Sequence, residues 1–175
     1  MINTGLAFIS SVFITRLLGA EGRGEYSLFT SSLQLFVVWL GFSLPVSIIY
    51  FVSGEKISKD RIFSTMLLFC LLTTLLVVLL LTVLNYAGGL WIIFPEKFRN
   101  IYWQLFFVSQ FFIMQLNGII IAYLNAFKIF TPQAKFASLS AFLSLVVWVL
   151  LYFKVINLPW SGFQLVVFVS FILSI

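Results

Sequence analysis

Five amide side chains interrupt an otherwise apolar stretch, IYWQLFFVSQFFIMQLNGIIIAYLNAF, at residues 101–127. Gln110 and Asn117 are seven residues apart and share one face of a helix, while Gln104 and Gln115 share another face roughly 140° away. Amides are costly in lipid, so they should turn toward other helices or toward a wet cavity. Two interpretations stay open: the amides tie helices together, or they line a path for a polar substrate.

A second polar face is expected in residues 26–52, where Gln34, Gly41 and Pro45 follow one another at spacings of seven and four. Proline removes a helix hydrogen bond and kinks the helix. The face is either a close-packing surface of small residues or a hinge that lines a transport route. Our candidate residues for a cavity or for helix packing are Gln34, Pro45, Gln104, Gln110, Gln115, Asn117 and Asn125.

Other chemistry is missing from the apolar runs. The sequence has no histidine, and its five acids all fall outside these runs, at Glu21, Glu25, Glu55, Asp60 and Glu96. There is therefore no pair of acids for acid–base catalysis, no metal cluster and no histidine-activated nucleophile. We expect no enzyme activity, no cofactor and no metal, and no intramembrane carboxylate is present to couple transport to an ion.

The composition is that of an integral membrane protein. Hydrophobic residues make up 62% of the 175 residues and charged residues only 9%, against roughly 25% in soluble domains. The net charge of +5 is scattered and forms no basic stripe, so nucleic acid is not an expected partner and membrane lipid is. Cys70 stands alone in an apolar run and is expected to act as a small hydrophobe.

Charges and turn residues divide the chain into apolar segments, and helices are the default for spanning a bilayer. We predict an all-α, polytopic transmembrane bundle, a single domain over residues 1–175. Its six helices are expected at 2–18, 26–52, 62–86, 101–127, 137–153 and 163–175. The sixth segment reaches the end of the sequence without a charged stop, which predicts that this is the front part of a longer chain.

The connections carry the anchoring residues. The 87–100 connection, with Trp91, Phe94 and Pro95, is expected to include a piece lying in the membrane interface, and Pro132 predicts a turn or a helix start. Lys and Arg are equally numerous on the two sides of the predicted bundle. The dense short loop at 54–61 favours its own side as cytoplasmic, which places the N-terminus inside.

The stretch RLLGAEGRGEY, residues 16–26, joins the first two predicted helices. Its glycines allow a tight turn, and its charges hold that turn at the water interface. Arg16 either extends to the interface from the end of the first helix or meets an anionic headgroup or pyrophosphate.

This stretch resembles the first-loop signature of the polysaccharide-biosynthesis flippases, the Wzx-like branch of the multidrug/oligosaccharidyl-lipid/polysaccharide exporter superfamily. These proteins commonly read R-x-L-G-x-x-G-x-G-x-Y, which is met here by Arg16, Leu18, Gly19, Gly22, Gly24 and Tyr26. LGFSLPVSIIYFVSGEK and YLNAFKIFTPQAK also look like family segments, in hydropathy and loop spacing.

The resemblance implies the N-terminal lobe of a two-lobe exporter in the bacterial cytoplasmic membrane. The expected substrate is an undecaprenyl-pyrophosphate-linked oligosaccharide, flipped for cell-surface polysaccharide synthesis as the lobes rock to expose a cavity to each side in turn. The second lobe would come from a C-terminal part beyond residue 175 or from another chain. The alternatives are a drug or metabolite exporter of the same superfamily and a non-transporting scaffold subunit.

Overall fold

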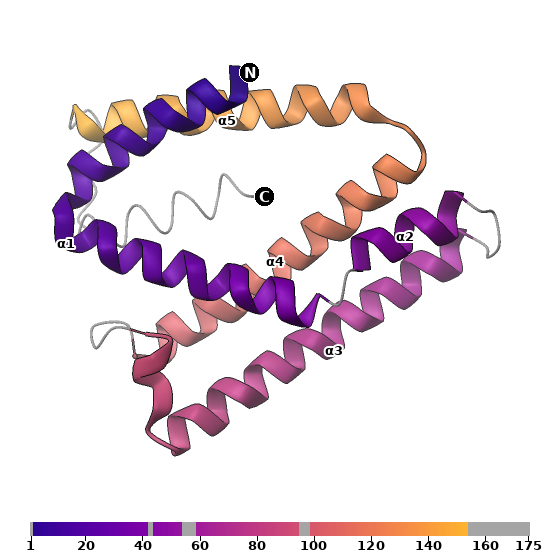
Figure 1. The fold of residues 1–175 in the computed structure, drawn as a ribbon, viewed down its shortest axis with the longest axis horizontal. Helices are drawn as coiled ribbons and strands as arrows, with labels where there is room; N and C mark the ends of the chain where they lie inside the picture. The colour runs from indigo at the N-terminus through magenta and orange to yellow at the C-terminus, as the bar shows by residue number, and fades with distance from the viewer. Residues whose placement is uncertain (1, 42–43, 54–58, 95–98, 154–175) are drawn as a thin grey trace. The chain divides into compact units, whose positions relative to one another are not determined.

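The computed structural model describes residues 2–41, 44–53, 59–94 and 99–153, and every regular element among them is helical (Figure 1). The elements in chain order are α1 (Ile2–Leu40), α2 (Leu44–Ser53), α3 (Lys59–Tyr86), the short 3-10 helix η1 (Gly89–Ile92), α4 (Ile101–Ala126) and α5 (Phe130–Tyr152). They fall into two compact units. Unit 1 comprises Met1–Ser27 and Thr131–Ile175, and unit 2 comprises Leu28–Phe130.

Four helices are long and apolar enough to cross a membrane, judged by length and composition. They are Thr4–Leu40, Arg61–Tyr86, Ile101–Ala126 and Ala134–Tyr152. The expected all-helical class is therefore confirmed, and α3, α4 and α5 lie close to three of the predicted segments. α5 includes Pro132 in its first turn, so this proline marks a helix start. The predicted sixth helix at 163–175 lies outside the described residues.

In the stretch 16–26 the expected tight turn is made at a single residue, and this part of the chain is otherwise helical. α1 runs through it, and the non-helical torsion angles inside α1 belong to Gly19 (φ 70°, ψ −175°). One residue in this region, which is essentially restricted to glycine, is enough to redirect the chain. A helix begins again directly afterwards, and Glu21 in its first turn suits the positive end of the helix dipole.

At Gly19 the chain folds back on itself within unit 1. A guanidinium nitrogen of Arg23, Nη1, lies 3.4 Å from the main-chain oxygen of Ser11. In an uninterrupted helix, twelve residues would separate these positions by about 18 Å. The two arms of α1 on either side of Gly19 can therefore face a common space.

α5 packs beside the first arm of α1 and runs in the same direction. Phe13 and Tyr152 form an edge-to-face ring pair with centroids 5.3 Å apart. Trp148 and Leu151 are buried at the centre of this packing. The apolar side chains around them are Phe13, Ile14, Leu17, Leu18, Tyr26 and Val147.

The segment predicted as one helix at 26–52 is broken, not merely kinked. α1 ends at Leu40 and α2 begins at Leu44, so Pro45 lies in the first turn of α2, where proline is tolerated. Gly41 is buried, and a Cβ there would clash with the main-chain oxygen of Val37. Hydropathy alone could not indicate this break because the residues on both sides are apolar.

Unit 2 is built around α4, with α2 and α3 beside it (Figure 1). α3 runs antiparallel to α4: Phe63 pairs with Tyr123, and Cys70 lies near the main-chain oxygen of Phe112. The buried residues of this core are Ile48, Val52, Ile62, Cys70, Ile119 and Ala122. Cys70 is fully buried, as expected for a small hydrophobe.

The connection between α3 and α4 is fixed by an aromatic cluster. Phe94 is completely buried, with its ring centroid 5.2 Å from Phe107 and 6.3 Å from Phe29, whereas Trp91 is 65% exposed. The connection therefore has one exposed aromatic side chain, Trp91, and one buried aromatic side chain, Phe94, and its location in the membrane interface stays a prediction. Pro95 lies outside the described residues.

Replacing Gly19 with alanine should destabilise unit 1 by about 1–3 kcal/mol, because an L-residue is strained at these torsion angles. Gly24→Ala is the matched control, since Gly24 is helical with open space around it and alanine favours a helix by about 1 kcal/mol. Thermal unfolding in detergent should show a lower Tm for the first variant and an equal or higher Tm for the second. Equal Tm values for both variants would contradict the assigned role of Gly19.

Replacing Phe94 with alanine should cost about 3–5 kcal/mol, because it empties a fully enclosed ring position. Trp91→Ala, on the same connection but exposed, should change stability by less than about 0.5 kcal/mol. The measurement is Tm in the same detergent. A larger effect of Trp91→Ala would show that the outward ring, not the inward one, holds the connection.

Candidate functional site: a polar pocket in unit 1

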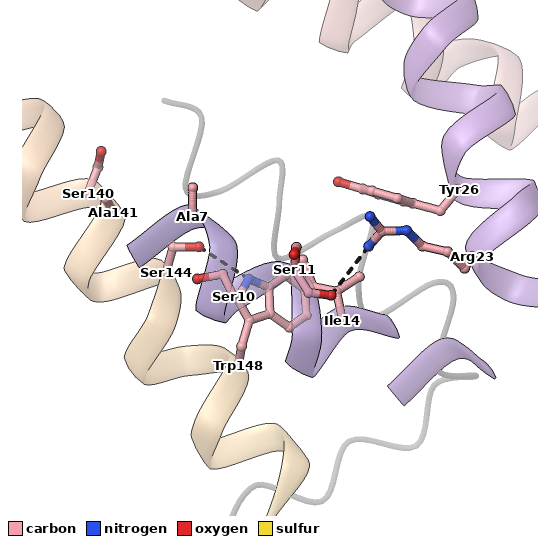
Figure 2. Close-up of a pocket in the computed structure, with 10 residues that line it drawn as sticks. All are labelled: Ala7, Ser10, Ser11, Ile14, Arg23, Tyr26, Ser140, Ala141, Ser144 and Trp148. Atoms are coloured by element: carbon pink, nitrogen blue, oxygen red, sulfur yellow. Dashed lines mark hydrogen bonds between the residues drawn. The ribbon is translucent and has the colours of Figure 1, made fainter. Parts of the chain in front are cut away.

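A pocket of about 410 Å³ lies in unit 1, within the range of small-molecule sites (Figure 2). Three stretches of chain contribute to it: the first arm of α1, the helix after Gly19, and α5. Its lining residues are Ala7, Ser10, Ser11, Ile14, Arg23, Tyr26, Ser140, Ala141, Ser144 and Trp148. Four hydroxyl-bearing serines, a tyrosine and a guanidinium are an unusual collection in so apolar a chain.

One wall comes from α5. Ser140, Ser144 and Trp148 follow one another at intervals of four residues and so share a helix face. The indole Nε1 of Trp148 donates a hydrogen bond to Ser144 Oγ at 3.2 Å (Figure 2), and the Trp148 side chain is almost completely buried. The hydrogen bond fixes the ring and leaves the Ser144 hydroxyl free to donate its own proton toward the pocket.

A second wall, next to the first, comes from the first arm of α1. Ser10 is 7% exposed, and Ser11 donates its hydroxyl to the main-chain oxygen of Phe8 at 2.8 Å. The main-chain oxygen of Ser11 accepts from Thr15 Oγ1 at 2.7 Å as well as from Arg23 at 3.4 Å. This carbonyl therefore keeps a short hydrogen bond from Thr15 whether or not Arg23 contacts it.

Arg23 supplies the charge of the pocket. It is half-buried, and Figure 2 shows its guanidinium directed toward Ser11 across the pocket. A guanidinium carries five N–H donors in a planar fork. Within the described ranges no carboxylate forms an ion pair with Arg23, and the 3.4 Å contact to Ser11 is long for a hydrogen bond.

The side chains of the pocket suit the binding of an anionic, hydroxylated group. Its guanidinium matches phosphate or carboxylate oxygens, and its hydroxyls match a hydroxylated group next to that anion. No acid or histidine stands among the lining residues to move a proton. Among the described residues, no group of three or more His, Cys, Asp or Glu side chains could hold a metal ion.

Only part of the motif-like stretch at 16–26 reaches the pocket. Tyr26 lines it, Leu18 packs beside the buried Trp148, and Gly19 provides the reversal. Arg16 is exposed and does not line the pocket, and Gly24 has open space around it.

The predicted cavity amides all belong to unit 2 and do not line this pocket. Gln104, Gln110 and Gln115 are buried, and Gln104 donates from Nε2 to the main-chain oxygen of Arg99 at 2.9 Å. Gln34, Pro45 and Asn117 are exposed, and Asn125 is half-buried. Gln110 and Asn117 thus differ in burial although their spacing places them on one face of α4.

Most of the pocket residues are not indicated by the sequence. Arg23 occupies a variable position of the stretch at 16–26, and isolated serines in an apolar helix usually serve packing. One signal was available: the Ser140–Ser144–Trp148 spacing of four gathers three hydrogen-bonding side chains on one face of an apolar segment.

The described residues thus form an all-helical structure with four helices long and apolar enough to cross a membrane, and with a cationic, hydroxyl-rich pocket in one unit. No protein-family model, curated protein or solved structure matches the chain. The resemblance of residues 16–26 to the flippase signature therefore stays a prediction.

Arg23→Gln should remove the preference of the pocket for an anion. We expect the purified chain to bind farnesyl phosphate more tightly than farnesol, and the variant to bind the phosphate about tenfold more weakly, since a hydrogen bond to a charged group contributes about 1.5–3 kcal/mol. Arg61→Gln, an exposed arginine on α3 outside the pocket, is the charge-matched control. Titrations followed by native mass spectrometry give both affinities, and an unchanged preference in Arg23→Gln would exclude the pocket as the anion site.

Proposed function

We propose that the chain is part of a membrane transporter that flips a lipid-linked, undecaprenyl-pyrophosphate oligosaccharide across the bacterial cytoplasmic membrane by alternating access. The observation that carries this proposal is the pocket itself: a guanidinium and four serines brought together by apolar, membrane-length helices. A lipid-linked sugar phosphate has the matching parts, an anion and hydroxyls on a lipid chain. The motif-like stretch at 16–26 adds support because it contributes Tyr26 and the Gly19 turn.

The charged and the hydroxyl-bearing side chains of the pocket would contact different parts of the substrate. Arg23 would neutralise a phosphate oxygen, and the Ser10, Ser140 and Ser144 hydroxyls would exchange hydrogen bonds with the adjoining sugar. A volume of about 410 Å³ suits one small group, so the rest of the glycan would extend beyond the pocket. Gly19 would let the arm that carries Arg23 move relative to the arm that carries Ser11, as alternating access requires.

The same chemistry favours the flippase over the two alternatives. A cationic pocket repels the positively charged compounds that many drug exporters would have to accept. A scaffold subunit has no need for a pocket lined by a guanidinium and hydroxyls, because helix association in lipid can be achieved by small residues alone.

The test is genetic. Removing the gene from its host should deplete surface polysaccharide and accumulate lipid-linked glycan in the membrane. Arg23→Gln should fail to restore export, whereas Arg61→Gln should restore it. Arg16→Ala should retain more export than Arg23→Ala, because Arg16 is exposed and outside the pocket.

Immunoblots of the membrane fraction control for loss of protein. Unchanged surface polysaccharide after gene removal would overturn the flippase function. Full export by Arg23→Gln, with gene removal still abolishing it, would overturn only the role of the pocket.

A further inference from the structure

A second polar feature lies in unit 2, where α4 passes the end of α1. Gln115 is 5% exposed, and its Nε2 has no hydrogen-bond partner among the described residues. This nitrogen lies beside Gly41, since a Cβ built on Gly41 would be 3.4 Å from it. Gln115 is in the middle of a membrane-length helix, where an amide donor without an acceptor is strongly disfavoured.

The end of α1 offers the complementary groups. A helix leaves carbonyls in its last turn without an intrahelical donor, and α1 ends at Leu40. The Gly41 N–H donates to the Val37 oxygen at 2.9 Å, and that oxygen has a second lone pair. In an apolar membrane segment such carbonyls are satisfied by neighbouring side chains or by ordered water. The Nε2 group of Gln115 is a hydrogen-bond donor that lies beside this end of α1.

Charge decides which ligand fits between these groups. The negative end of the α1 dipole disfavours an anion, and the N–H₂ group of Gln115 disfavours a cation. A group that accepts from Nε2 and donates to a carbonyl must be neutral and must carry both functions. A hydroxyl is the smallest group that does so.

We propose that Gln115 and the end of α1 at residues 37–41 form a buried site for one hydroxyl group, which bridges Gln115 Nε2 to a main-chain carbonyl. The hydroxyl belongs either to a water molecule or to a sugar. The site is separate from the unit 1 pocket and does not depend on the proposed transport function.

The sign of one stability change tests the proposal. If the hydroxyl bridges the two groups, Gln115→Leu removes the bridge and should lower Tm by several degrees. If Nε2 is instead an unsatisfied donor, the same apolar replacement of similar size should raise Tm. Gln104→Leu, which breaks a direct hydrogen bond to the Arg99 oxygen, shows the size of a genuine loss in the same helix.

The source of the hydroxyl is settled by the medium. The chain is purified in lauryldimethylamine oxide, which carries no hydroxyl group, and measured without and with octyl glucoside. A lower Tm of Gln115→Leu in the first medium, together with radiolytic hydroxyl-radical labelling of Val37 or Leu40 in the wild type that the variant loses, identifies water. A lower Tm only after octyl glucoside is added identifies a sugar hydroxyl. An equal or higher Tm of Gln115→Leu in both media overturns the site.

Discussion

A helix break in apolar surroundings releases main-chain polar groups that must find partners, and this constraint governs the structure at two places. α1 departs from helical geometry at Gly19, and it ends at Leu40 within a segment that is apolar on both sides. The polar pocket of unit 1 and the buried amide of Gln115 each lie next to one of these breaks. The Ser11 carbonyl faces Arg23 across the first, and Gln115 faces Gly41 beside the second. In a chain with so few charged residues, polar side chains are found where these helix breaks offer main-chain groups to pair with.

Different kinds of side chain lie beside the main-chain polar groups at the two breaks. At Gly19 the chain folds back, so a long charged side chain reaches over the first arm of α1 and its contact remains weak at 3.4 Å. Thr15 holds the same carbonyl at 2.7 Å, so Arg23 can exchange its contact for a ligand without leaving the carbonyl unsatisfied. At Gly41 the neighbour is a neutral amide that is almost completely buried. Among the described residues, this site has no charged side chain that could pair with an ionic ligand, so a group that bridges Gln115 to the main chain has to be neutral.

The sequence was sufficient for the class of fold and for three helices, and physical reasons explain the rest. α3 and α4 match the predicted 62–86 and 101–127 closely because long apolar runs bounded by charges leave little freedom in a membrane. The first helix, predicted at 2–18, ends next to the reversal at Gly19, whereas the break at 41 is not indicated because hydropathy does not report backbone torsion angles. Glycine was expected to turn the chain at 16–26, but only Gly19 does so, and Gly22 and Gly24 are helical.

The candidate residues illustrate the same limit. The amides on α4 were recognised from their type, and three of them are buried, but spacing along one helix could not show that Asn117 would be exposed. Burial depends on which neighbouring helix covers a given level of α4. The pocket required knowledge of a reversal at one residue, because Arg23 and Ser11 are on the same element and would be far apart if that element were straight.

The Gly19 reversal also gives a reason why a motif of glycines and charges would be useful in a transporter. The reversal places one arginine in the same pocket as serines of α1 and α5, and the restarted helix keeps the arginine within a regular element instead of a loop. Sites on helices are held more accurately than sites on loops. A single residue outside the helical region therefore supplies the turn. The groups that would contact a polar cargo remain fixed within their own arms.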